Sequence, residues 1–182
     1  MKKIIGFVGS PRKNGNTSEL VKATLKGAED NGAETKIYYL NEMEIKGCQS
    51  CHYCRGHETC SIKDDMQAVY EDIKTADGLV IGSPVYMWQV SGQTKLLLDR
   101  FFPLTNNAHQ PRFGEKKVVM VYSQAAPVPE IFKQYFDYNE KMVQPLGFRV
   151  VDTIVATKAI APGSVTKDQE LMNKAFQAGK LL

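Results

Sequence analysis

The chain has 182 residues, which is enough for one domain with a buried core. Its hydrophobic fraction of 43% and charged fraction of 24% are ordinary for a globular protein. The net charge of +3 comes from scattered basic residues and favours neither a nucleic-acid nor a membrane partner. The apolar run Ile4–Val8 is too short for a signal peptide, and no stretch approaches the roughly 18 apolar residues of a membrane span. We therefore expect a cytoplasmic protein whose four cysteines are metal ligands or reactive thiols rather than disulfides.

Short β-branched runs alternate with longer helical patterns along the chain. The runs predict five strands: Lys3–Val8, Thr35–Leu40, Gly78–Ser83, Lys117–Tyr122 and Phe148–Ala156. Apolar residues at helical spacing predict five helices: Asn16–Asn31, one that begins at Asp64, Gly92–Phe102, Pro129–Val143 and Lys167–Leu182. For the second of these helices, Asp64 as N-cap and Gln67 three residues later predict a capping box.

This alternation predicts an α/β fold, in which a parallel sheet is covered by helices on both faces. We expect one domain over residues 1–182, with an irregular insertion at about residues 41–63 that holds all four cysteines. Ligands of such folds bind beyond the carboxyl ends of the strands, where the strand order reverses. The loops after the first, third and fourth strands are therefore the predicted site.

The loop after the first strand, Gly9–Ser18, is rich in hydrogen-bond donors. It leads into a helix N-terminus, where free backbone N–H groups and the helix dipole attract an anion. Five side chains add donors: Ser10, Arg12, Asn16, Thr17 and Ser18. The Gly-Lys-Ser/Thr of a nucleotide-triphosphate loop and the GxGxxG of a dinucleotide site are both absent. The alternative is an ordinary strand-to-helix loop with a Ser/Thr cap, and the number of donors favours an anion site.

GSPRKNGNTSEL resembles the FMN-phosphate loop of the flavodoxin-like NADPH-dependent FMN reductase superfamily. The segment from Ser83-Pro84-Val85-Tyr86 to Asp99-Arg100 is similar to the family's SPVY…K…DR segment. Ser123-Gln124-Ala125 takes the place of the third flavin loop, although Ala125-Ala126 stands where many relatives carry glycine. The resemblance covers essentially the whole chain. It implies a three-layer sandwich with a five-stranded parallel sheet in the order 2-1-3-4-5.

The resemblance also implies FMN as the cofactor. The implied binding residues are Ser10, Arg12, Asn14, Asn16, Thr17, Ser18, Pro84, Val85, Tyr86, Met87, Trp88, Ser123 and Gln124. From the residues themselves, Tyr86, Met87 and Trp88 would supply the apolar wall that a flat redox ring needs. They would equally suit a core or an oligomer interface, where aromatic residues and Met are enriched. We interpret Asp99 and Arg100 as an ion pair at a helix end, and expect no side chain to act as an essential acid or base.

The four cysteines follow the pattern C-x2-C-x2-C-x5-C at Cys48, Cys51, Cys54 and Cys60. Three thiolates at successive three-residue spacings favour a [4Fe–4S] cluster over the separated pairs of a zinc site. The pattern also resembles the iron-sulfur flavoprotein branch of the superfamily. Zinc and free or redox-active thiols remain open, since similar flavin reductases lack one or more of these cysteines. The loop histidines His52, His57 and His109 are assigned no role.

These expectations combine into an FMN-dependent oxidoreductase or electron-transfer flavoprotein with a [4Fe–4S] cluster. A cluster-free NAD(P)H-dependent FMN or quinone reductase is the first alternative, and a non-catalytic flavodoxin-like carrier is the second. Against the carrier stands the weakly basic charge, because such carriers tend to be acidic. The resemblance implies a homodimer or homotetramer, with the cluster of one protomer serving the flavin of another. The expected electron donor is NAD(P)H or a ferredoxin.

Overall fold

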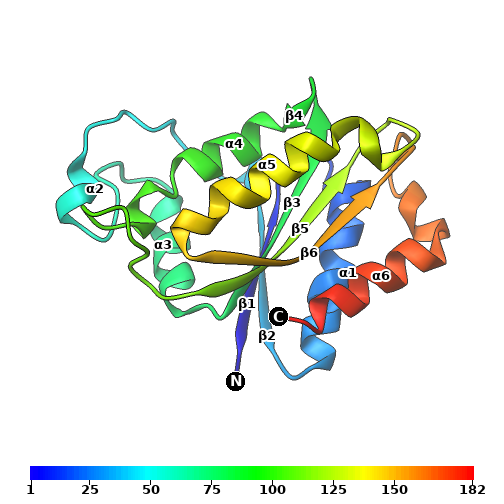
Figure 1. The fold of residues 1–182 in the computed structure, drawn as a ribbon, viewed down its shortest axis with the longest axis horizontal. Helices are drawn as coiled ribbons and strands as arrows, with labels where there is room; N and C mark the ends of the chain where they lie inside the picture. The colour runs from blue at the N-terminus through cyan, green and yellow to red at the C-terminus, as the bar shows by residue number, and fades with distance from the viewer.

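The computed structural model describes residues 1–182 and has a central parallel sheet with helices on both faces (Figure 1). The strands are β1 Lys3–Val8, β2 Glu34–Tyr39, β3 Gly78–Tyr86, β4 Gln89–Val90, β5 Lys116–Ser123 and β6 Phe148–Ala156. The helices are α1 Asn16–Asp30, α2 Tyr53–Gly56, α3 Met66–Thr75, α4 Gly92–Asp99, α5 Lys133–Val143 and α6 Gln169–Gly179. Each predicted strand and helix is present; β1 and β6 have the predicted ends, and the other elements differ by a few residues at one or both ends.

The strand order β2-β1-β3-β5-β6 confirms the predicted flavodoxin-like sheet, and these five strands are all parallel. The prediction of five strands in total was wrong, because a sixth strand, β4, pairs antiparallel with the end of β3. The third strand also runs beyond its predicted end at Ser83 to Tyr86. A strand of two residues is too short for its alternation to be recognised in a sequence.

The two faces of the sheet build two hydrophobic clusters. Along β5, Val118 and Met120 point into one cluster of 21 buried residues, and Val119 and Val121 into another of 15. Helices α3, α4 and α5 lie on the first face, and α1 and α6 on the second (Figure 1). None of the helices is both long enough and apolar enough to cross a membrane.

The predicted capping box at the start of α3 was wrong. The N-cap is Asp65, and its side chain makes no capping hydrogen bond. The carboxylate of Asp64 accepts from the Met66 N–H at the start of α3, 3.2 Å away, and is also bound by the buried guanidinium of Arg100, with Nη1–Oδ2 2.6 Å and Nη2–Oδ1 3.1 Å. The Gln67 amide donates to the carbonyl of Cys60, 3.1 Å away, rather than reaching back to the helix start. The same carboxylate therefore serves both the start of α3 and a buried cation, which needs a charged partner.

Candidate functional site

An open cleft of about 260 Å³ lies at the carboxyl edge of the sheet. This volume lies slightly below the range of about 300–1,000 Å³ that is usual for small-molecule sites. Twelve residues line it: Ser10, Arg12, Gly15, Asn16, Thr17, Pro84, Val85, Tyr86, Ser123, Ala125, Ala159 and Ile160. The ends of β3 and β5 and the loops that follow β1, β5 and β6 therefore meet here, as expected where parallel strands end.

The start of α1 has free backbone donors, and two of the residues that carry them, Asn16 and Thr17, line this cleft. The N-cap Gly15 has no side chain, and the backbone N–H groups of Asn16, Thr17 and Ser18 make no hydrogen bond. Together with the helix dipole, three free N–H groups in one turn form an anion site. The exposed Arg12 stands at the rim of the cleft and adds a positive charge.

Neighbouring loops hold this turn in place. The hydroxyl groups of Thr17 and Ser123 are 2.7 Å apart and join the loop after β1 to the loop after β5. The hydroxyl of Ser91, the N-cap of α4, donates to the carbonyl of Gly9 at 2.6 Å. Only glycine fits at position 9, because a Cβ atom there would lie 1.7 Å from the hydroxyl of Thr94. The first turn of α4 thus packs directly against the Gly9–Ser18 loop.

Eight of the thirteen predicted cofactor residues line the cleft: Ser10, Arg12, Asn16, Thr17, Pro84, Val85, Tyr86 and Ser123. Five do not line it: Asn14, Ser18, Met87, Trp88 and Gln124. Within the first group, the Asn16 side chain is already engaged, since its amide donates to Ala161 O and accepts from the Val165 N–H. Asn16 is therefore available to a ligand through its backbone only.

The loop after β6 is a part of the cleft that the sequence prediction missed. Ala159 and Ile160 line it, and the Ile160 carbonyl lies 3.4 Å from the Arg12 guanidinium. Both residues are apolar or small and form no recognisable motif. Their place follows from the rule that all parallel strands end at one edge, which the prediction applied to three loops only.

Met87 and Trp88 form the two-residue turn of the β3–β4 hairpin, which projects at the carboxyl edge (Figure 1). Their φ angles are 45° and 66°, as a tight hairpin of this kind requires. Side chains other than Gly, Asn and Asp are strained there, at a cost of order 1–3 kcal/mol each. Their side chains are 82% and 66% exposed. The chain therefore holds two large apolar side chains in solvent at the expense of backbone strain.

The four cysteines line one cavity at the other end of the molecule. Cys48 and Cys51 are exposed, Cys54 and Cys60 are buried, and none forms a disulfide. Ser50 and His52, on either side of Cys51, adopt left-handed φ angles of 50° and 57°. These two residues turn the chain sharply, so that successive cysteines face the same cavity.

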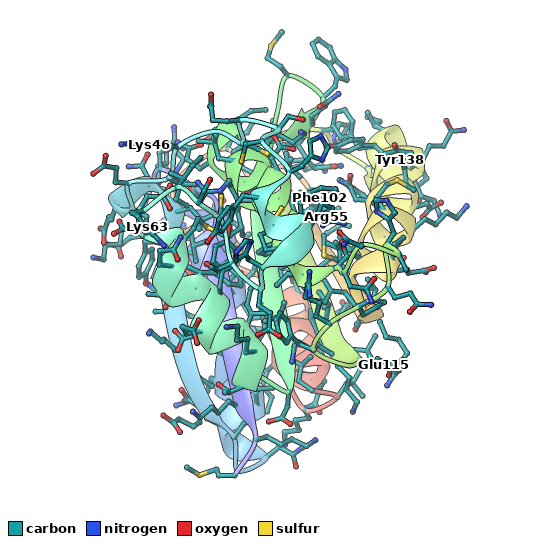
Figure 2. All side chains as sticks on the ribbon, turned by 90° about the vertical axis from the view of Figure 1, so that its left-hand side faces the viewer. Lys46, Arg55, Lys63, Phe102, Glu115 and Tyr138 are labelled. Carbon is teal, nitrogen blue, oxygen red and sulfur yellow. The ribbon has the colours of Figure 1, made fainter.

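Two arginines fix the cysteine segment, residues 41–63, to the loop after α4. The Arg55 guanidinium stacks on the Phe102 ring at 3.6 Å from its centroid (Figure 2) and donates to the Asn106 carbonyl at 2.7 Å. From the other side, Arg112 donates to the Cys54 carbonyl at 3.2 Å. Near the cavity mouth, the Ser61 hydroxyl lies 3.4 Å from the Cys51 sulfur, and this contact lowers the pKa of Cys51.

The four sulfur atoms share the cavity without being gathered at ligand distances. Nowhere in the chain do three or more His, Cys, Asp or Glu side chains stand close enough to hold a metal ion. The donor chemistry nevertheless fits an iron–sulfur cluster, since four free thiols of the predicted spacing surround one cavity. In addition, Arg100 lines that cavity and its buried Nε atom has no hydrogen-bond partner.

The interpretation of Asp99 and Arg100 as one ion pair was wrong. Asp99 pairs with Lys95 on the exposed side of α4, whereas Arg100 turns inward to Asp64. The side chains of Arg100 and Asp64 are 1% and 0% exposed. Burial opposes the charge of Asp64, but the hydrogen bonds from Arg100 and from backbone N–H groups outweigh it and lower the pKa of Asp64. These two residues lie 36 positions apart in the sequence, which carries no signal of their pairing.

Residues 2–145 match the profile of the NADPH-dependent FMN reductase family. The chain belongs to this family. An iron-sulfur flavoprotein of Archaeoglobus fulgidus is 30% identical over 97% of this chain and 77% of its own length. Another, from Methanocaldococcus jannaschii, is 42% identical over 56% of this chain and 53% of its own length. The chain thus spans about half the length of several curated relatives that it matches.

Solved structures support the fold of this FMN reductase family member. A NAD(P)H:quinone oxidoreductase from Methanothermobacter marburgensis superposes with a TM-score of 0.72 at 17% identity, over 99% of this chain and 96% of the other. An FMN-dependent NADH-azoreductase from Bacillus anthracis superposes with a TM-score of 0.70 at 12% identity, over 100% of this chain and 99% of the other. The predicted family and fold are therefore both confirmed.

In this member of the family, the cleft and the cysteine cavity are separate. They share no lining residue, and α2 lies at the opposite end of the molecule from the carboxyl ends of β5 and β6 (Figure 1). A largely apolar groove between α4 and α5 extends from Cys48 at the cysteine cavity to Gln89 and Val90 in β4. Exposed Tyr138 and Met142 line the same groove.

Proposed function

We propose that this protein is an FMN-dependent oxidoreductase whose four cysteines bind a [4Fe–4S] cluster. The observation that carries the proposal is the cleft at the carboxyl edge, where the free N–H groups of α1 face the loops after β3 and β5. The flavin would supply the redox chemistry by accepting an electron pair and releasing electrons singly. The protein side chains would bind and orient it.

The phosphate of FMN would be held by the free N–H groups of Asn16, Thr17 and Ser18, with Arg12 pairing its charge. Tyr86, half exposed at the cleft, would border the ring. Pro84 and Val85, at the same end of β3, would continue this wall. Ser123, whose hydroxyl lies 2.7 Å from that of Thr17, lines the same cleft and would border the same phosphate group.

The cluster would be held by Cys48, Cys51, Cys54 and Cys60. Their spacing, their common cavity and the iron-sulfur flavoprotein relatives support this assignment. A resident cluster, which carries one electron at a time, would link a two-electron donor to one-electron acceptors. Since thiols persist in reducing compartments, the assignment also fits a cytoplasmic protein.

A cluster-free NAD(P)H-dependent FMN or quinone reductase is the second candidate. The observation that favours it is the separation of the sulfur atoms, which are not gathered around a metal position. In that case the cysteines would be free thiols. Steady-state oxidation of NAD(P)H with a quinone or free flavin as acceptor then separates either enzyme from a non-catalytic carrier.

Self-association into a dimer or tetramer is part of the proposal. Because the cleft and the cysteine cavity lie apart in one chain, a cluster that serves a flavin would have to reach the flavin of another protomer. The exposed and strained Met87–Trp88 turn and the apolar groove between α4 and α5 supply contact surface for a second copy. NAD(P)H or a ferredoxin would donate electrons.

Arg12→Ala is expected to weaken FMN binding about 10- to 100-fold, because a hydrogen bond to a charged group contributes about 1.5–3 kcal/mol. Thr17→Ala is expected to weaken it as well, since the variant also loses the contact with Ser123. Both dissociation constants are measured by titrating FMN with the apoprotein and following the quenching of flavin fluorescence. Lys13→Ala is the control, because it removes the same charge from a neighbour that lies outside the cleft. Equal effects of Arg12→Ala and Lys13→Ala would contradict a specific phosphate contact.

Protein purified without oxygen is expected to contain about four iron atoms and four sulfides per chain. Its visible absorption, beyond that of the flavin, should bleach with dithionite. Serine at any one of the four cysteines is expected to remove most of this iron, whereas Ser50→Ala in the same cavity retains it. A flavin spectrum without iron or sulfide would exclude the cluster and leave the second candidate.

A further inference from the structure

The cysteine segment is tied at both ends to one buried side chain. The Arg100 guanidinium donates to the Lys46 carbonyl at 2.6 Å and to both carboxylate oxygens of Asp64. The Asp64 carboxylate in turn accepts from the Lys46 N–H at 3.0 Å. Lys46 precedes Cys48 by two residues and Asp64 follows Cys60 by four. One guanidinium at the end of α4 therefore closes the loop that carries all four cysteines.

Arg100 also supplies the positive charge of the cavity. The charged residues that line the cavity with the cysteines are Arg100 and Asp99, and Asp99 pairs with Lys95 on the exposed side of α4. The Nε atom of Arg100 is buried and has no partner, although its residue lines the cavity. A buried donor without a partner destabilises the fold, because it has lost its hydrogen bonds to water. An anionic group in the cavity would offset this destabilisation.

The cluster that we expect in the cavity is an anion, which suits the free N–H donor at Arg100 Nε. A cluster with four thiolate ligands is anionic and gains one more negative charge when it accepts an electron. A fixed, buried cation beside it stabilises the reduced form more than the oxidised form. Asp64 acts in the opposite direction, because its negative charge lies against the same guanidinium.

We propose that Arg100 is a positioning residue of the cysteine cavity, which closes the ligand loop, donates a hydrogen bond from Nε to the bound cluster and raises its reduction potential. Asp64 is the opposing charge, and it limits the rise while it keeps the guanidinium in place. This inference rests on the proposed function, since it requires that the four cysteines bind a cluster.

The test compares variants of the anaerobically purified protein by redox titration. Arg100→Gln is expected to lower the midpoint potential of the cluster, and Asp64→Asn is expected to raise it. A purely structural role of the pair would not give shifts of opposite sign. Lys63→Gln is the matched control, because Lys63 is exposed beside Asp64 in the sequence and points outward on the same side as Lys46 (Figure 2). The Lys63→Gln variant removes one positive charge that solvent screens, so its shift in the midpoint potential of the cluster should be the smallest of the three.

A second readout covers the case in which Arg100→Gln does not fold. Arg100→Lys keeps the charge opposite Asp64 but loses Nε and the forked geometry. It is expected to lower the potential, and to release iron to a chelator about 10- to 100-fold faster than the wild type, as expected when an outer partner of a metal site is lost. Circular dichroism confirms that each variant is folded before its potential is compared.

The outcomes separate this inference from the proposed function. If the wild type holds the cluster, but the Arg100 and Asp64 variants shift the potential in the same direction or no more than Lys63→Gln, the role of Arg100 is overturned and the cluster assignment stands. If the wild type holds neither iron nor sulfide, the cluster assignment fails and this inference fails with it. Opposite shifts that exceed the control support both.

Discussion

Asp64→Ala is expected to lower the free energy of unfolding by about 3–5 kcal/mol, because it leaves the Arg100 guanidinium buried without a counter-charge. The two side chains are 1% and 0% exposed, so solvent cannot replace the lost partner. The substitution also leaves the Lys46 N–H without its acceptor. Urea denaturation followed by circular dichroism measures the loss.

Asp99→Ala is the control for this prediction. It removes the same group from the exposed Lys95–Asp99 pair on α4, and a pair of this kind contributes about 0.3–0.5 kcal/mol. If Asp64→Ala costs no more than Asp99→Ala, the buried pair does not stabilise the fold. The comparison therefore distinguishes burial from the mere presence of an ion pair.

The lowered pKa of Asp64 sets how the stability contributed by the Asp64–Arg100 pair depends on pH. Because its pKa is lower in the folded state, the ionised carboxylate stabilises the fold above the unfolded value of about 3.9. That stabilisation is lost as the pH falls through the folded pKa. The difference in the free energy of unfolding between the wild type and Asp64→Asn is therefore expected to be constant above about pH 5 and to shrink below about pH 4. A difference that instead grew toward acid would contradict the lowered pKa.

Gly27→Ala and Gly179→Ala are each expected to destabilise the protein by about 1–3 kcal/mol or more, through overpacking between α1 and α6. A Cβ atom at Gly27 would lie 1.9 Å from the Phe176 carbonyl oxygen, and one at Gly179 would lie 1.8 Å from that of Thr24. Both obstacles are backbone atoms, so the helices would have to move apart. Thermal or urea unfolding measures the effect.

The sign of this prediction is opposite to that of helix propensity. Alanine is favoured over glycine inside a helix by about 1 kcal/mol, so an isolated helix would gain from either substitution. Gly92→Ala is the control, because a Cβ atom there meets nothing within 4 Å at the start of α4. Its expected change is below about 0.5 kcal/mol. If Gly27→Ala stabilised the protein, the close approach of α1 and α6 would be wrong.

Helix α4 connects the two candidate sites. At its N-terminus, Ser91 donates to the carbonyl of Gly9 in the loop that would hold the flavin phosphate. At its other end, Arg100 closes the cysteine segment. A substitution that shifted this helix would therefore be expected to disturb flavin binding and the cysteine cavity together, although the two cavities have no lining residue in common.

Local pattern was enough to find most of the secondary structure. The strands Lys3–Val8 and Phe148–Ala156 have the predicted ends, because apolar runs bounded by Gly, Ser or Pro depend on neighbouring residues only. The donors of the Gly9–Ser18 loop and the cysteine spacing are likewise local, and they predicted both candidate sites. Their recognition as family motifs supplied the strand order, which local pattern does not contain.

Contacts between distant residues were decided by the tertiary structure alone. The pairing of Arg100 with Asp64, the meeting of Thr17 with Ser123 and the place of Ile160 beside Arg12 each join separate elements. Asp64 fits a helix cap by local rules, yet a buried guanidinium binds it more strongly. Local sequence therefore predicted the elements other than the short β4 and α2, together with the family and the donor groups. Packing decided which donors face a ligand, because burial sets which charges must pair.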